Sequence, residues 1–138
     1  MSSGYRVRVE FSSAERLQYD RAVAIGRDVS EPVKVTYVFV LESPGPRPDA
    51  TEEALLAMGA AEVVVDEEVS GDGWWHVAAF TTLRLTPEAI RKSKQQMMRL
   101  AVAHGIRYAG WKVTLNVAEE RKLTSRRPDL ALLTADTM

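Results

Sequence analysis

The run Val33-Lys34-Val35-Thr36-Tyr37-Val38-Phe39-Val40-Leu41 decides the fold, because it is dense in the β-branched and aromatic residues that favour strands. Pro32 precedes this run and Pro44-Gly45-Pro46 follows it, so residues that interrupt regular structure bound it on both sides. The run is therefore predicted to form the central strand of a sheet.

The segment after this strand predicts a short helix and then a hairpin. Asp49-Ala50-Thr51-Glu52 has N-cap spacing with Asp49 as the cap, and the helix should end at Gly59. Its expected inward residues are Ala54, Leu55 and Met58. Residues 62–67 then predict a strand. The turn residues Ser70-Gly71-Asp72-Gly73 predict that the run from Trp74 to Leu85 returns antiparallel to it.

The longest predicted helix begins at Thr86-Pro87-Glu88, where Thr86 is a natural N-cap and proline fits the first helical position. Gly105 should end it. The stripe that faces the core comprises Ile90, Ser93, Met97, Leu100, Ala101 and His104. The residues from Tyr108 to Val117 predict the last strand.

The two ends of the chain add further elements to this pattern. Tyr5 to Phe11 alternate apolar with charged residues and predict a short edge or added strand. Ser12-Ser13-Ala14-Glu15 predicts a capping box that opens a helix over about residues 14–27, with a thin apolar stripe of Leu17, Ala24 and Ile25. After Ala118 the chain mixes charges with Pro128 and Leu130-Ala131-Leu132-Leu133, which we interpret as a tail that docks back on the domain.

The order strand, helix, strand, strand, helix, strand predicts an α+β fold. It is the ferredoxin-like β-α-β-β-α-β antiparallel sheet with an N-terminal strand-helix extension. The strand at Val33 should lie between those that begin near Trp74 and Tyr108. We expect residues 1–32 to form the extension packed on the domain, residues 33–118 the ferredoxin-like domain and residues 119–138 the C-terminal tail.

Strand alternation assigns the two faces of this sheet, since the core face must hold the larger apolar set. The side covered by the helices is assigned Val35, Tyr37, Phe39, Leu41, Trp75, Val77, Ala79, Leu83, Trp111, Val113, Leu115 and Val117. The open face is assigned an apolar centre of Val38, Val40, Ala78 and Phe80, ringed by Trp74, His76, Tyr108 and Lys112. Such rimmed patches mark interfaces. Either the N-terminal extension or the tail covers this one, or a protein partner or a second copy of the chain binds it.

Composition narrows the function classes. The chain has 138 residues, no cysteine and a net charge of -1. The lack of cysteine excludes disulfide frameworks, thiolate metal sites and cysteine nucleophiles. No apolar run is long enough to span a bilayer and the N-terminus lacks the apolar stretch of a secretory signal, so we expect a cytoplasmic protein. Near-neutral charge argues against direct nucleic-acid binding.

The sequence contains no residue pattern that is typical of a catalytic site or of a cofactor site. His76 and His104 are the only histidines and are better explained by structural roles. The acids Asp66, Glu67, Glu68 and Asp72 cluster around the predicted hairpin without a partner of metal-ligand spacing, and no glycine-rich phosphate loop occurs. We therefore expect no metal site, no cofactor and no enzymatic activity.

Lys94-Gln95-Gln96-Met97-Met98-Arg99-Leu100-Ala101, followed by Gly105-Ile106-Arg107-Tyr108-Ala109-Gly110-Trp111, resembles the end of the regulator of ribonuclease E activity B family. The resemblance extends over roughly residues 16–118. It implies a ferredoxin-like fold. It also implies a protein that binds an endoribonuclease of the RNA-degrading assembly and inhibits it without chemistry of its own.

The sequence therefore predicts a binding module that regulates another protein, with an RNA-processing nuclease as the expected partner. Three alternatives stay open at this point. They are an immunity-type antitoxin, a domain that senses a small molecule on its open sheet face, and an enzyme of unrecognised type.

Overall fold

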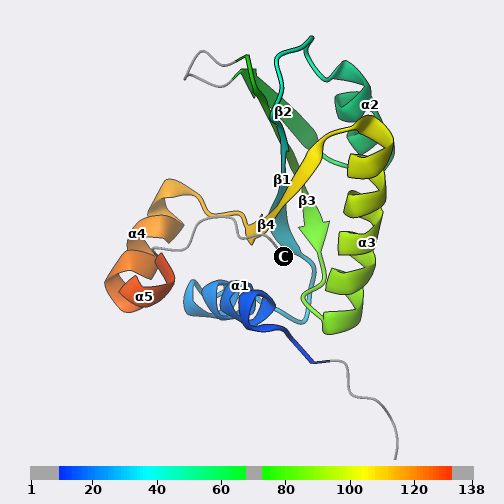
Figure 1. Cartoon of the computed structure of the whole chain (residues 1–138). Coiled ribbons are helices and arrows are strands. Elements are labelled where there is room, and N and C mark those ends of the chain that lie inside the picture. Colours follow the sequence, from blue (N-terminus) through cyan, green and yellow to red (C-terminus); the bar gives the residue numbers. More distant parts are fainter. Residues whose placement is uncertain (1–9, 68–72, 132–138) are drawn as a thin grey trace, which may run out of the picture.

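A computed structural model describes residues 10–67 and 73–131, and shows an α+β fold built on a four-stranded antiparallel sheet (Figure 1). The strands are β1 (Val33–Leu41), β2 (Glu62–Glu67), β3 (Trp75–Leu83) and β4 (Arg107–Val113). The helices are α1 (Ser13–Ala24), α2 (Asp49–Ala57), α3 (Pro87–His104), α4 (Val117–Arg126) and α5 (Pro128–Ala131). The strand predicted over Tyr5 to Phe11 and the turn predicted over Ser70 to Gly73 fall largely outside the described residues.

The sheet has the order β2-β3-β1-β4, which confirms β1 as a central strand. Antiparallel β3 lies on one side of β1, with Val38 opposite Ala78, and antiparallel β4 lies on the other, with Tyr37 opposite Trp111. Residues 62–67 form an edge strand on β3, with Val64 opposite Ala78.

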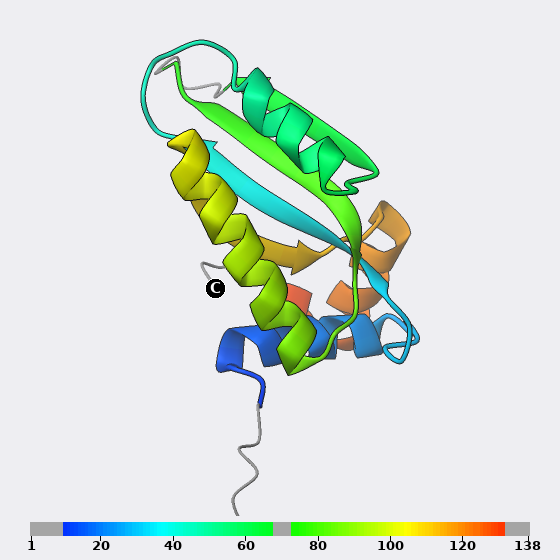
Figure 2. The same ribbon diagram turned by 90° about the vertical axis from the view of Figure 1, so that its right-hand side faces the viewer.

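Helices lie on both sides of this sheet. Figures 1 and 2 show α2 and α3 side by side over one face, whereas α1, α4 and α5 gather on the other side near the end of β4. The face beneath α2 and α3 is called the helix-side face below, and the opposite one the open face.

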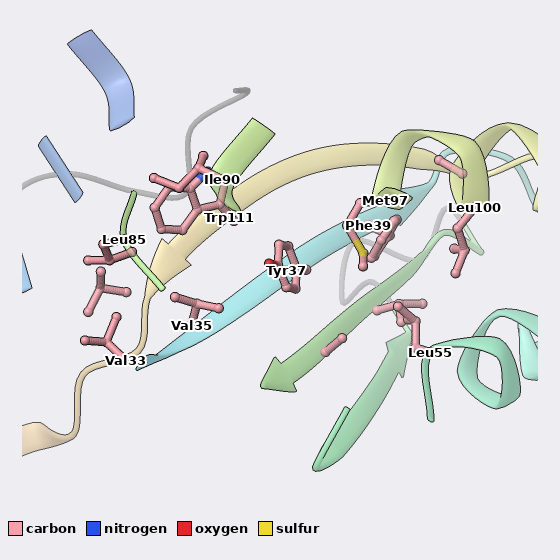
Figure 3. Packing of buried hydrophobic residues seen from close by; sticks show 14 of the residues in the cluster. Val33, Val35, Tyr37, Phe39, Leu55, Leu85, Ile90, Met97, Leu100 and Trp111 are labelled. Atoms are coloured by element: carbon pink, nitrogen blue, oxygen red, sulfur yellow. The ribbon is translucent and has the colours of Figure 1, made fainter. Parts of the chain in front are cut away.

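The core lies between the helix-side face and α2 and α3 (Figure 3). Trp111 from β4 is only 1% exposed, and Ile90 and Leu100 bring α3 onto the strands. Most of the residues predicted for this face are buried, which confirms the assignment for Val35, Tyr37, Phe39, Val77, Ala79, Trp111 and Val113.

The ends of α1 and α3 follow the sequence signals. The Thr86 hydroxyl accepts from the Ala89 amide at 3.3 Å, and Gly105 closes α3 in the left-handed conformation with φ of 62°. Ser12 and Glu15 form the predicted capping box at the start of α1.

The predicted start of α2 is wrong in detail. Pro48 occupies the N-cap position and Asp49 is already inside the helix, so no side chain caps this end. The Asp49 carboxylate instead accepts from the guanidinium of Arg47, which also donates to Glu52 at 2.6 Å. Met58, predicted to face inward, is an exposed side chain at the C-cap.

The last strand is shorter than predicted. It ends at Val113, and Asn116 caps a helix that we did not predict, α4. The Asn116 side chain accepts from the Glu119 amide at 2.8 Å and the Glu119 carboxylate accepts from the Asn116 amide at 3.1 Å. Val117 is exposed at the first position of α4, so its assignment to the sheet core is wrong.

The chain after β4 packs against the end of α1. Leu123 from α4 and Leu130 from α5 form a small second cluster with Ile25. An ion pair supports this contact, because the Arg27 guanidinium donates to both Glu119 carboxylate oxygens at 2.8 Å. The hydrogen bond from Arg27 is the main reason that the pKa of Glu119 lies below its usual range.

The predicted apolar stripe of α1 is confirmed, because Leu17, Ala24 and Ile25 all pack in this second cluster. A further buried face of the helix, which was not predicted, is mainly polar. Glu15, Gln18 and Arg21 are all buried beside Ala22. Gln18 is fully buried, and its Oε1 accepts from the Val113 amide of β4 at 2.9 Å. A side chain of the helix therefore satisfies one backbone hydrogen-bond donor of the edge strand β4. Only a polar side chain on the inward face can do this.

Candidate protein-binding face

The open face contains a hollow of about 240 Å³ over the two central strands. Val38 from β1 lies opposite Ala78 from β3, and Phe80 lies two residues further along β3 on the same face. All three side chains are half-buried. They form an apolar floor that α2 and α3 do not cover.

Polar groups surround this floor on the side of β4. The hydroxyls of Thr36 and Thr114 are 2.7 Å apart and hydrogen-bonded to each other. Lys112 and Thr114 line the hollow from β4 and the residue that follows it, and Lys112 is half-buried.

Two further charges come from the helices beside the hollow. Arg21 reaches it from α1 and Glu120 from α4. Burial lowers the pKa of the Arg21 guanidinium, and the Glu120 carboxylate partly offsets this effect. The lining thus holds two basic groups and one acidic group around an apolar centre.

Three of the predicted site residues, Val38, Phe80 and Lys112, meet at this hollow. Val40 and His76 lie opposite each other further along the β1–β3 ladder, and Trp74 precedes β3. Val40 is only 7% exposed, so it belongs to the packed interior more than to an accessible surface.

Tyr108 lies on the helix-side face, so its assignment to the open face is wrong. The β1–β4 register pairs Val38 with Gly110 but Phe39 with Tyr108, which leaves Ala109 as an extra residue. Such a β-bulge moves the residues before it to the opposite face. The Tyr108 ring consequently packs on the ring of Phe39 with centroids 5.3 Å apart.

The bulge depends on Gly110, whose φ of 128° is a conformation that side chains disfavour. Burial raises the pKa of the Tyr108 hydroxyl, and its nearness to Tyr37 adds to the effect. Within the described part of the chain this hydroxyl has no hydrogen-bond partner.

Sequence reasoning missed Arg21, a charged residue outside the predicted apolar stripe of its helix, and Glu120, which lies in the segment interpreted as a tail. One signal was present: Glu15, Gln18 and Arg21 recur every three residues, the spacing of one helix face. Because the residues of that face are polar, their burial could not be recognised from the sequence.

The described residues contain neither a cluster of metal-ligating side chains nor a membrane-spanning helix. Residues 10–67 and 73–131 contain no group of three or more histidine, aspartate or glutamate side chains that could hold a metal ion. Glu68 and Asp72 of the predicted acidic cluster lie outside these ranges. In the same residues, no helix is both long and apolar enough to cross a membrane.

The fold is a small α+β domain, and the open face of its sheet contains a hollow with an apolar floor. The sequence model of the family described as regulator of ribonuclease activity B matches residues 8–113. This match spans well over half of the chain, so the protein belongs to that family, which confirms the resemblance. No curated protein and no solved structure matches the chain significantly.

Proposed function

We propose that this protein is a non-catalytic regulator that binds ribonuclease E in the cytoplasm and inhibits RNA cleavage through its open sheet face. Membership of a family of ribonuclease regulators supports the activity. The strand order and the two helices on one face support the finer assignment of a ferredoxin-like fold.

The observation that carries this proposal is the half-buried apolar floor of the hollow. Val38, Ala78 and Phe80 lie on the side of the sheet that α2 and α3 leave uncovered. An apolar floor with a charged rim is the arrangement found at protein interfaces, where large side chains near the centre contribute most of the binding energy.

The predicted residues take different roles in this proposal. Phe80 and Val38 act as anchors at the centre, and Lys112 acts at the rim. Trp74 and His76 extend the same face toward the start of β3, whereas the buried Val40 supports this face from within. Tyr108 has no part in it, because its ring faces the core.

The proposal is tested by measuring binding of purified ribonuclease E to the Val38→Asp, Phe80→Asp double variant. We expect at least a tenfold loss of affinity, since two carboxylates would replace the apolar anchors. Charge reversal in Lys112→Glu should mainly slow association, as rim charges do. Circular dichroism confirms beforehand that each variant is folded.

A matched control uses the same kinds of substitution on the helix layer. Val102 in α3 is 83% exposed and Leu56 in α2 is 46% exposed, so the Val102→Asp, Leu56→Asp variant adds the same charge away from the open face. This control should bind as the wild type does. Full binding by the folded open-face variant would overturn the proposed surface. A wild-type dimer that the open-face variant abolishes would show that a second copy occupies this surface instead.

A further inference from the structure

A second cavity lies on the other side of the sheet, between α2 and α3, and has a volume of about 240 Å³. Figure 2 shows β1 and β3 running behind these two helices, and Tyr37 from β1 and Ala79 from β3 line the cavity. Leu55 and Met58 line it from α2 and the residue after it, and Ser93 and Met97 line it from α3. It shares no residue with the hollow on the open face.

The cavity exists because several positions around it carry small side chains. Ala79 on β3, Ala89 on α3 and Ala60 after α2 are too short to fill the space between the helices. Further along the sheet, large side chains close the same layer, as Phe39 and Leu100 do in Figure 3. Leu55, Ala79 and Met97 give the cavity a mainly apolar wall.

A pair of buried hydroxyls adds a specific polar group at the floor. The Tyr37 hydroxyl and Ser93 Oγ are hydrogen-bonded to each other, although the two residues are only 3% and 8% exposed. Each hydroxyl has one hydrogen, and their mutual bond uses only one of the two. The pair can therefore donate a further hydrogen bond to an oxygen placed above it.

The mouth of the cavity carries one charge. Lys92 is the only charged side chain among the described residues that line it, and no carboxylate lines it with Lys92. Gln96 follows one helical turn later and lies on the same side of α3. An anionic group at the mouth would meet an ammonium and an amide donor together.

We propose that this cavity binds a small carboxylic acid that has an apolar body and a hydroxyl at its far end. The carboxylate pairs with Lys92 and Gln96, the body lies against Leu55, Ala79 and Met97, and the hydroxyl bonds to the Tyr37–Ser93 pair. A few convergent polar groups in an apolar recess are the usual features of a small-molecule site. The site is separate from the proposed ribonuclease-binding face, so either one can fail without the other.

The test uses 3-(4-hydroxyphenyl)propanoate as the probe and titration calorimetry with the whole protein as the measurement. Tyramine, of similar shape but with an ammonium in place of the carboxylate, is the charge-inverted comparison. We expect the wild type to bind the acid and not the amine. Absence of binding at millimolar acid, or equal binding of acid and amine, would overturn the proposal.

Variants of residues that line the cavity test whether the acid binds there. Lys92→Glu should weaken binding of the acid at least tenfold, whereas Lys94→Glu, the same change two residues along α3 and outside this cavity, should leave it unchanged. Ala89→Met should also weaken binding, because it fills the cavity without a change of charge. Circular dichroism confirms that the variants are folded, and unchanged binding by folded Lys92→Glu and Ala89→Met would place the acid elsewhere.

Discussion

Trp111 is the residue whose packing links β4 to the rest of the core. It lies opposite Tyr37 in the β1–β4 ladder and is almost fully buried. Trp111→Ala should lower the free energy of unfolding by roughly 3–5 kcal/mol, through lost burial and the cavity that it leaves. Urea denaturation measures this change. An unchanged midpoint would show that Trp111 is not part of the core.

Tyr37 is buried and Tyr108 is half-buried, and their hydroxyl groups have different environments. Because the Tyr108 hydroxyl has no partner in the described structure, Tyr108→Phe should leave stability unchanged or raise it slightly. Tyr37→Phe removes the hydrogen bond with Ser93 and should cost about 1 kcal/mol. Thermal denaturation of both variants compares them, and a larger loss for Tyr108→Phe than for Tyr37→Phe would contradict this assignment.

The same two tyrosines show how far alternation can be used to predict a face. Tyr37 lies in an unbroken stretch of β1, and its predicted face is confirmed. Tyr108 lies before the bulge, and one inserted residue is enough to reverse its face. A glycine in a strand is compatible with either a bulge or a close approach, so Gly110 alone could not decide between them.

At the scale of elements, the Arg27–Glu119 pair joins the end of α1 to the start of α4. The pKa of Glu119 is lowered mainly by its hydrogen bond with Arg27, so the folded protein favours the ionised carboxylate. The resulting stability is present above the usual pKa of glutamate and is lost as the pH falls through the lowered one. Glu119→Gln should therefore cost about 1–2 kcal/mol at neutral pH and nothing in acid.

Denaturation of both proteins across the acid range measures this pH dependence. The Arg27→Met background is the control, because Glu119→Gln should have a much smaller and less pH-dependent effect once the guanidinium is gone. A cost of Glu119→Gln that stays constant from neutral to acid pH would show that the ion pair does not contribute to it.

The elements that the sequence predicted well are those with strong boundary residues. Thr86-Pro87 and Gly105 fix α3, and the prolines around β1 fix the central strand. Helix α4 was missed because its composition resembles a solvated tail. Its capping pair Asn116 and Glu119 nevertheless has the three-residue spacing that identified Ser12 and Glu15 in α1.

At the scale of the whole molecule, the small net charge conceals a separation of charge. Residues 42–67 contain seven acidic and one basic side chain, whereas residues 84–131 contain eleven basic and four acidic ones. Such a separation orients an approaching charged partner, which is consistent with a binding protein. Composition alone could not show this separation, because the net charges of the two regions nearly cancel.

Part of the candidate site could also be predicted from the sequence. The apolar centre at Val38 and Phe80 follows from alternation in β1 and β3, which are regular strands. The contributions of Arg21 and Glu120 depend on how α1 and α4 pack beside the sheet, and no local pattern encodes that packing.

The function that we propose for this protein is the inhibition of a ribonuclease without chemistry of its own. Its most direct test is the rate at which purified ribonuclease E cleaves a fluorogenic RNA while this protein is added up to and beyond equal molar amounts. We predict that the rate falls as the protein is added, that the open-face variant leaves it unchanged, and that the protein alone does not cleave the RNA. An unchanged rate with saturating wild-type protein, or cleavage of the RNA by the protein alone, would contradict the account.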